Sequence, residues 1–123
     1  MATVLVVDDD ADVLQTVATI IRRAGHTVIE ASSAIGALKV LDPDIAVDLM
    51  VTDIMMPGLN GFNLARMARQ KRHRLKILYL TGYADQAAVL SDAGEQYGKL
   101  LNKPILPPDL RREVAQVLAC ELC

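Results

Sequence analysis

Short apolar runs alternate with amphipathic helical patterns along almost the whole chain. The apolar runs predict five strands, at residues 3–8, 27–30, 48–53, 77–80 and 99–102. Each gap between runs is long enough for a helix, so consecutive strands can lie parallel with a helical crossover between them. Strands that are apolar throughout are typical of a sheet covered on both faces. The sequence therefore predicts an α/β fold with a doubly wound, five-stranded parallel sheet.

Helix-capping and helix-breaking residues mark the ends of the segments between these strands. Serine and asparagine are preferred helix caps, proline suits the first helical turn, and glycine or proline commonly follows the last turn. Five helices are predicted in this way: one with an apolar face at residues 13–21 that ends at Gly25, one capped by Ser33 and closed by Pro43, one opened by Asn60 or Gly61, a short one at residues 84–93, and one introduced by Pro107, Pro108 and Asp109.

A single domain accounts for the length and composition. The chain has 123 residues, is 52% hydrophobic and carries a formal net charge of -2. This length and composition suit one buried core, and the chain is too short for two. We therefore expect one domain over residues 1–123. No apolar run approaches the about 18 to 20 residues that cross a bilayer, and no secretory signal pattern opens the chain. We expect a cytoplasmic protein without a membrane partner.

Polar and charged residues stand where the predicted strands end. Asp8 and Asp9 follow the first strand, Asp53 ends the third, Thr81 follows the fourth and Lys103 follows the fifth. Each alone is an ordinary turn or surface residue, as is Asp10, which we interpret as a helix cap. In a doubly wound sheet, however, ligands bind beyond the carboxyl ends of the strands. Their coincidence on one edge indicates a functional site.

Charge suggests the chemistry of that site. Crowded carboxylates repel one another unless a cation neutralises them, and hard oxygen ligands suit Mg²⁺, with Mn²⁺ as the alternative. With the metal present, Asp53 stays ionised as a nucleophile, while Lys103 and the Thr81 hydroxyl can bind phosphoryl oxygens. The small Gly82 leaves room for a backbone N–H at the same group. These residues predict phosphoryl transfer onto Asp53.

These residues belong to four short motifs, which follow one another along the chain. They are Val6-Val7-Asp8-Asp9, then Asp53 with Met56-Pro57-Gly58 and Gly61, then Thr81-Gly82, then Lys103-Pro104.

Together the four motifs resemble the receiver domain of two-component response regulators, and residues 81–84 and 98–104 are similar to receivers attached to hybrid sensor kinases. The resemblance covers essentially the whole chain. It implies a flavodoxin-like (βα)5 fold with strand order 2-1-3-4-5. It also implies a histidine kinase or phosphotransfer protein that donates a phosphoryl group to Asp53, so that contacts with an output partner change. Such a domain is not a turnover enzyme on external substrates.

The resemblance also assigns roles to individual residues. Asp9 ligates the metal directly, Asp8 acts largely through metal-bound water, and Asp53 and the Met55 carbonyl complete the ligands. Lys103, Thr81, Gly82 and Met55 form the phosphoryl-binding set. The Lys103–Pro104 bond is expected to be cis.

One position departs from the family pattern. Receivers commonly carry Tyr or Phe three residues before the lysine, whereas this chain has Leu100. A switch that couples the threonine to an aromatic ring is therefore not expected, unless Tyr83 or Tyr97 replaces the missing ring. By resemblance, the output face is formed by the fourth helix, the fifth strand and the fifth helix, in a monomer or a phosphorylation-dependent dimer.

A run of basic residues lies between the third helix and the fourth strand. Cations near a helix C-terminus complement the helix dipole without any partner. The chain is net acidic and only 3% aromatic, so it offers few rings for base stacking. We therefore predict no direct nucleic-acid binding by this run, which comprises Arg66, Arg69, Lys71, Arg72, His73, Arg74 and Lys76.

Three other functions stay open on the same fold. A flavin carrier would need a phosphate cradle near the first loop, where Asp8 to Asp10 repel anions. An aspartyl phosphatase usually has a second acid two residues after the nucleophile, and position 55 is Met. A phosphorylation-independent interaction module is compatible with an intact site, and is the main alternative.

Overall fold

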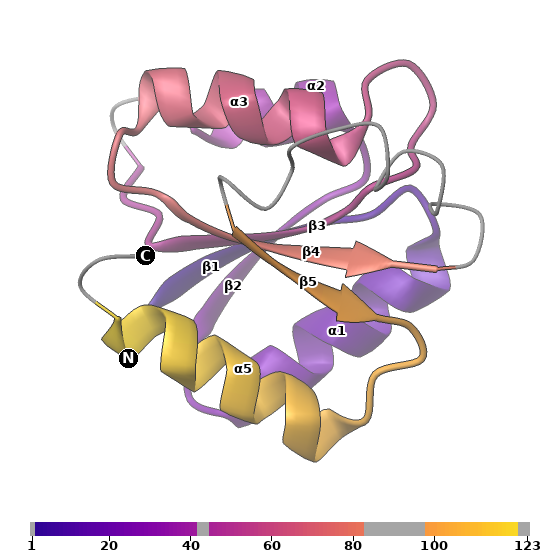
Figure 1. Ribbon diagram of the computed structural model, residues 1–123, viewed down its shortest axis with the longest axis vertical. Helices are drawn as coiled ribbons and strands as arrows, with labels where there is room; N and C mark the ends of the chain where they lie inside the picture. Colours follow the sequence, from indigo (N-terminus) through magenta and orange to yellow (C-terminus); the bar gives the residue numbers. More distant parts are fainter. Residues whose placement is uncertain (1, 42–44, 83–97, 121–123) are drawn as a thin grey trace.

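A parallel sheet organises the molecule. The structure is a computed structural model and describes residues 2–41, 45–82 and 98–120. Within these residues the strands are β1 (Thr3–Val7), β2 (Thr27–Ala31), β3 (Leu49–Asp53), β4 (Lys76–Thr81) and β5 (Gly98–Asn102). Every neighbouring pair is parallel, in the order β2-β1-β3-β4-β5 (Figure 1). The predicted doubly wound sheet and its strand order 2-1-3-4-5 are confirmed.

Helices cover both faces of the sheet. Helices α2 (Ala34–Val40) and α3 (Gly61–Lys71) lie on one face, and α1 (Ala11–Arg23) and α5 (Pro107–Ala119) lie on the other (Figure 1). The helix predicted at residues 84–93 lies outside the described residues, as does Pro43.

The predicted caps act largely as expected. The Ser33 hydroxyl accepts the Gly36 N–H at 3.0 Å, and the Asn60 carbonyl oxygen accepts the Asn63 N–H at 2.8 Å. Asn60 is therefore the cap of α3, and Gly61 is its first helical residue. Helix α1 ends two residues before the predicted stop at Gly25, which follows it with φ +99°.

Two apolar layers form the core, one on each side of the sheet. Because side chains alternate across a strand, Leu5 and Val7 pack toward α2 and α3, while Val4 and Val6 pack toward α1 and α5. Strand β3 is buried along its whole length. A buried strand that ends in Asp53 holds this carboxylate on rigid backbone.

Leu100 takes part in the first of these layers. It lies opposite Tyr79 on the neighbouring strand and packs, half-buried, against the core on the α2 and α3 side. Tyr79 itself makes an edge-to-face contact with Phe62, with ring centroids 5.0 Å apart. Tyr83 and Tyr97, the two rings considered as substitutes for an aromatic at position 100, lie outside the described residues.

No helix among the described residues combines the length and apolar character needed to span a bilayer.

Candidate functional site

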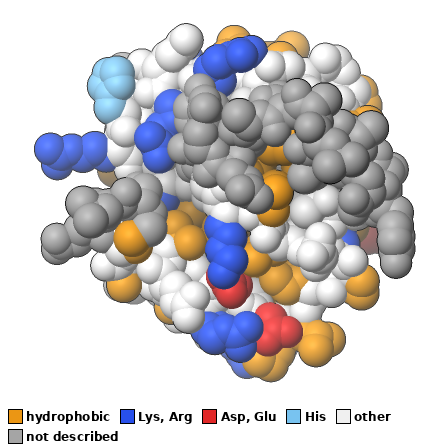
Figure 2. All heavy atoms as spheres, in the orientation of Figure 1, with side chains coloured by type: hydrophobic (Ala, Val, Ile, Leu, Met, Phe, Trp, Pro, Cys, Tyr) orange, Lys and Arg blue, Asp and Glu red, His pale blue; other side chains and the backbone are white. Residues whose placement is uncertain are grey.

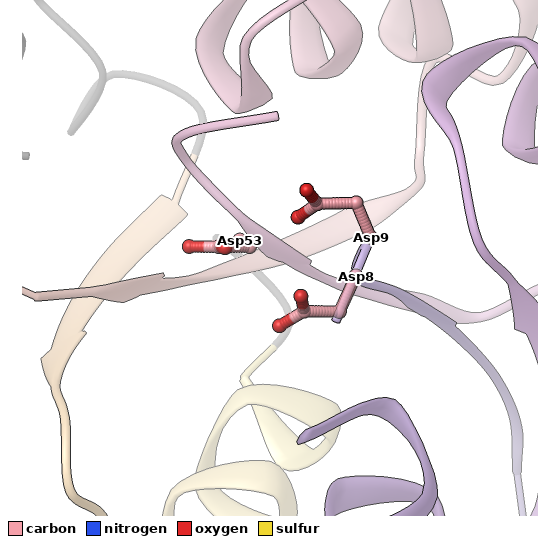
Figure 3. Close-up of side chains that lie close together, drawn as sticks. All are labelled: Asp8, Asp9 and Asp53. Carbon is pink, nitrogen blue, oxygen red and sulfur yellow. The ribbon is translucent and has the colours of Figure 1, made fainter. Parts of the chain in front are cut away.

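Three carboxylates meet at the carboxyl edge of the sheet. Asp8 and Asp9 follow β1, and Asp53 ends the adjacent strand β3, where Val7 pairs with Thr52. Carboxylate oxygens of all three residues lie within 4.8 Å of one another. Figure 3 shows the three carboxyl groups gathered beyond the strand ends. The sequence prediction that these acids share one place is therefore confirmed.

Asp8 is the most buried member of the cluster, at 1% exposed. Its Oδ1 accepts the backbone N–H of Asp10 at 2.9 Å. Its Oδ2 is buried, has no hydrogen-bond partner among the described residues, and lies 3.7 Å from the Lys103 ammonium. Asp10 itself caps α1 by accepting the N–H groups of Asp12 and Val13, as predicted.

Lys103 forms ion pairs, through its ammonium group, with two of the three acids, Asp8 and Asp53. Its Nζ lies 3.2 Å from Oδ1 of Asp53, and its backbone N–H donates to the Thr81 carbonyl at 2.7 Å. Asp53 Oδ1 also accepts the N–H of Ile54 at 2.8 Å. These contacts orient the Asp53 carboxylate, which is 7% exposed. The Lys103–Pro104 peptide bond is cis, as the family resemblance implied.

The other predicted site residues lie at the same edge. Thr81 ends β4 almost completely buried, and its hydroxyl lies 3.4 Å from the carbonyl of Gly82. The Met55 side chain is exposed in the loop after β3. The structure joins Thr81 to Lys103 through the backbone, while the phosphoryl-binding roles of Thr81, Gly82 and Met55 stay predictions.

Two glycines shape the loop after Asp53. Gly58 has φ +85°, a conformation that other residues rarely adopt. The Gly61 N–H donates to the Ile54 carbonyl at 2.7 Å, and a Cβ at Gly61 would lie 2.4 Å from the carbonyl oxygen of Asp53. This close approach requires glycine at position 61 and brings the chain back tightly against the backbone of Asp53.

Two contributors to the site were not predicted from sequence. The backbone N–H groups of Asp10 and Ile54 each donate to a site carboxylate. Ile54 has the sequence character of a core residue, and its side chain is indeed fully buried. No side-chain pattern marks a backbone donor, so only the turn geometry reveals it.

Burial raises the pKa of the Asp8 carboxyl above its ordinary value. Desolvation is the largest cause, and the nearby Asp53 and Asp9 charges act in the same direction. The Asp10 N–H and the Lys103 ammonium oppose this shift. In the metal-free protein, ionisation of Asp8 therefore lowers the stability of the folded state.

The donor set fits a hard divalent cation. Within the described residues, three carboxylates face a single ammonium, which leaves an excess of negative charge at the cluster. Oδ2 of Asp8 is a buried oxygen to which no described residue donates a hydrogen bond, and carboxylate oxygens are ligands that Mg²⁺ prefers. The residues present therefore suit the metal that the sequence predicted.

We expect the substitution Asp8→Asn to stabilise the metal-free protein. A raised carboxyl pKa means that the folded state holds its proton to higher pH than the unfolded state, so stability falls as pH rises from about 4 through the folded-state pKa. Asn keeps an acceptor for the Asp10 N–H and removes the charge. The gain should therefore be present at pH 7, where the Asp8 carboxyl of the parent is ionised, and smaller at low pH, where it is protonated.

Urea unfolding at pH 4 and pH 7 in EDTA would measure this effect. The gain should be larger at pH 7, and Asp9→Asn, which removes the same charge from an exposed position, should change stability less. An Asp8→Asn protein that is less stable than the parent at pH 7 would contradict the argument.

Fold and site together define a flavodoxin-like α/β domain with an acidic site at the carboxyl ends of its strands. Residues 4–115 match the model of the response regulator receiver domain family, and the chain belongs to that family. Membership implies a phosphoacceptor role in two-component signalling, with a histidine kinase as partner. Receiver domains typically bind Mg²⁺ through acidic residues, and this chain has the aspartate cluster for it.

Relatives of different lengths share this domain. The response regulator receiver protein CpdR of Brucella abortus is 30% identical over 118 residues, which cover 96% of this chain and 98% of CpdR. The sensor kinase CckA of the same organism is also 30% identical, over 95% of this chain but only 12% of the kinase. The chain spans 51% of a third relative, the response regulator SaeR of Staphylococcus aureus.

Solved structures show the same fold. A response regulator receiver domain protein from Clostridium thermocellum superposes with a TM-score of 0.85 at 26% identity, covering 96% of this chain and 94% of that one. The receiver domain of the hybrid histidine kinase CckA gives a TM-score of 0.79 at 26% identity, covering 94% and 98%.

Proposed function

We propose that this domain accepts a phosphoryl group on Asp53 from a phosphohistidine of a sensor kinase or phosphotransfer protein, in a Mg²⁺-dependent reaction that changes its contacts with an output partner. The main support is the Lys103 ammonium, which lies 3.2 Å from Asp53 and 3.7 Å from Asp8 beside three clustered carboxylates. A cation in this position can stabilise the negative charge of a phosphoryl group while that group forms a bond to Asp53.

The transfer exchanges one bond for another. A carboxylate oxygen of Asp53 forms a bond to phosphorus while the phosphorus–nitrogen bond to the donor imidazole breaks, and the imidazole leaves with that electron pair. The Ile54 N–H and the Lys103 ammonium hold Asp53 in place during this step. After transfer, Lys103 pairs with a phosphoryl oxygen and the Thr81 hydroxyl donates to another, beside the backbone of Gly82 and Met55.

Mg²⁺ would be held by Asp8, Asp9, Asp53 and the Met55 carbonyl, with Asp9 as a direct ligand and Asp8 acting largely through water. When bound, it supplies positive charge against the phosphoryl oxygens. The buried Oδ2 of Asp8, which accepts no hydrogen bond from any residue that the structure describes, supports this assignment.

The domain is a stoichiometric acceptor rather than a turnover enzyme. A phosphatase of this type would use a second acid to protonate its leaving group, and the residue two positions after Asp53 is Met55. We place the protein in the cytoplasm, where a kinase partner would supply the phosphoryl group.

We propose that phosphorylation at the site alters the surface of β5 and α5, and that the output partner binds this surface. The domain would act as a monomer or as a phosphorylation-dependent dimer. Leu100 has no hydroxyl with which to follow Thr81, and it is packed into the core. The change would therefore travel by repacking of elements at this surface.

Incubation with acetyl phosphate and Mg²⁺ followed by intact-mass measurement tests the proposal. We expect the mass of one phosphoryl group per chain, removed by hydroxylamine because an acyl phosphate is labile to it. A folded protein without any adduct would instead favour the phosphorylation-independent interaction module.

A further inference from the structure

A hollow lies at the edge of the sheet opposite to the edge that carries Asp53. It has a volume of about 780 Å³ and is formed by the segments that precede β1, β2, β3 and β4, together with the end of α5. We call it the basic cavity, because four of its lining residues are Lys or Arg and one is an acid: Lys71, Arg72, Arg74, Lys76 and Asp48.

Within the described part of the chain, the charges of three of the four cations of the basic cavity are not neutralised by an ion pair. Among the described residues, Lys71, Arg74 and Lys76 form no salt bridge. The single acid, Asp48, is already engaged, because its Oδ2 accepts the backbone N–H of Thr3 at 2.9 Å. Figure 2 shows Lys, Arg and His side chains on the left of the view, toward the starting ends of the strands, while the acidic side chains visible at the bottom lie beside other Lys and Arg side chains.

Two of the cations are held in position by backbone carbonyls, among other contacts in the case of Arg72. The Lys76 ammonium donates to the Leu118 carbonyl at 2.8 Å, and the Arg72 guanidinium donates to the carbonyls of Leu41 and Ile45. A carbonyl orients a cation without cancelling its charge. The side chains of Lys71 and Arg74 are exposed and can contact a ligand bound in the basic cavity.

Helix dipoles explain only part of this arrangement. Lys71 lies in the last turn of α3, where a cation is favourable without any ligand. Arg74 and Lys76 lie beyond that helix, in the turn before β4 and in β4 itself. The excess charge therefore calls for a further reason.

We propose that the basic cavity binds a small anion that carries two or more phosphate groups. Guanidinium and ammonium groups are the donors that proteins use for phosphate, and the volume is in the range of small-molecule sites. A compact ligand with several negative charges matches a hollow whose described lining holds more Lys and Arg than acid better than a single carboxylate does. His26 and His73 also line the hollow and offer ring N–H donors.

Calorimetric titration with inorganic tripolyphosphate, in Mg²⁺-free buffer at physiological salt, tests this proposal. The absence of Mg²⁺ keeps the probe from bridging to the acidic cluster. Arg74→Glu should weaken binding at least about tenfold, because it replaces an attraction by a repulsion. The matched variant Arg111→Glu, an equal charge reversal at an exposed position of α5, should change binding less than about twofold by the same reasoning.

Amide NMR shifts in the same titration locate the ligand. Changes at His73 and Leu75, with Asp53 and Lys103 unaffected, would support the basic cavity. No binding at physiological salt, equal weakening by the two variants, shifts centred on Lys103, or tighter binding of hexaglutamate than of tripolyphosphate would each overturn the proposal. Unchanged thermal melts of both variants establish that they are folded.

Discussion

Replacing Asp53 by Asn should abolish phosphorylation by acetyl phosphate, leaving no detectable adduct by intact mass. The amide keeps the shape of the side chain and an oxygen that accepts the Ile54 N–H, so the local structure should persist. It removes the negative charge and the second carboxylate oxygen, and an amide is not a nucleophile toward phosphorus. The loss should therefore be one of chemistry and not of folding.

Asp10→Asn is the matched control for this experiment. Asp10 is two residues from Asp8 in the chain but serves as the cap of α1, and Asn is as good a cap as Asp. This variant should be phosphorylated like the parent. An adduct of undiminished amount on Asp53→Asn would move the acceptor to another group and refute the assigned role of Asp53.

Much of this arrangement was predictable because it follows from short-range patterns. The apolar runs predicted the ends of all five strands to within one residue, and Asp8 lies just beyond the end of β1. Parallel connectivity then brought the strand ends to one edge, which is why Asp8, Asp9, Asp53 and Lys103 could be expected together.

The rest depends on three-dimensional detail that the residue pattern does not carry. Asp8 and Asp9 are neighbours of the same type, yet one is 1% exposed and the other is exposed, because the first still points into the sheet edge while the second has entered the turn. The raised pKa of Asp8 follows from that burial. The basic run was interpreted as a solvated helix end, whereas the structure folds its C-terminal half around a hollow with two of its cations anchored.

Removal of Mg²⁺ should have an effect as large as removal of the nucleophile. In EDTA, acetyl phosphate should leave the parent protein unmodified, because three carboxylates against one ammonium repel an incoming phosphoryl group. Added Mg²⁺ should also stabilise the folded state, by about 2.7 kcal/mol at a concentration 100 times the dissociation constant. Thermal or urea unfolding with increasing Mg²⁺ measures this second effect independently of phosphorylation.

Asp9→Asn separates metal binding from the other roles of the cluster. Asp9 is exposed and forms no salt bridge among the described residues, so without Mg²⁺ the variant should be about as stable as the parent. With Mg²⁺ it should gain far less stability and accept phosphate much more slowly, because a direct ligand is gone. The same change at Asp12, exposed in the first turn of α1 and outside the cluster, should leave both responses intact. Equal stabilisation of Asp9→Asn and the parent by Mg²⁺ would show that the ion is held elsewhere, and the charge argument for this site would then fail.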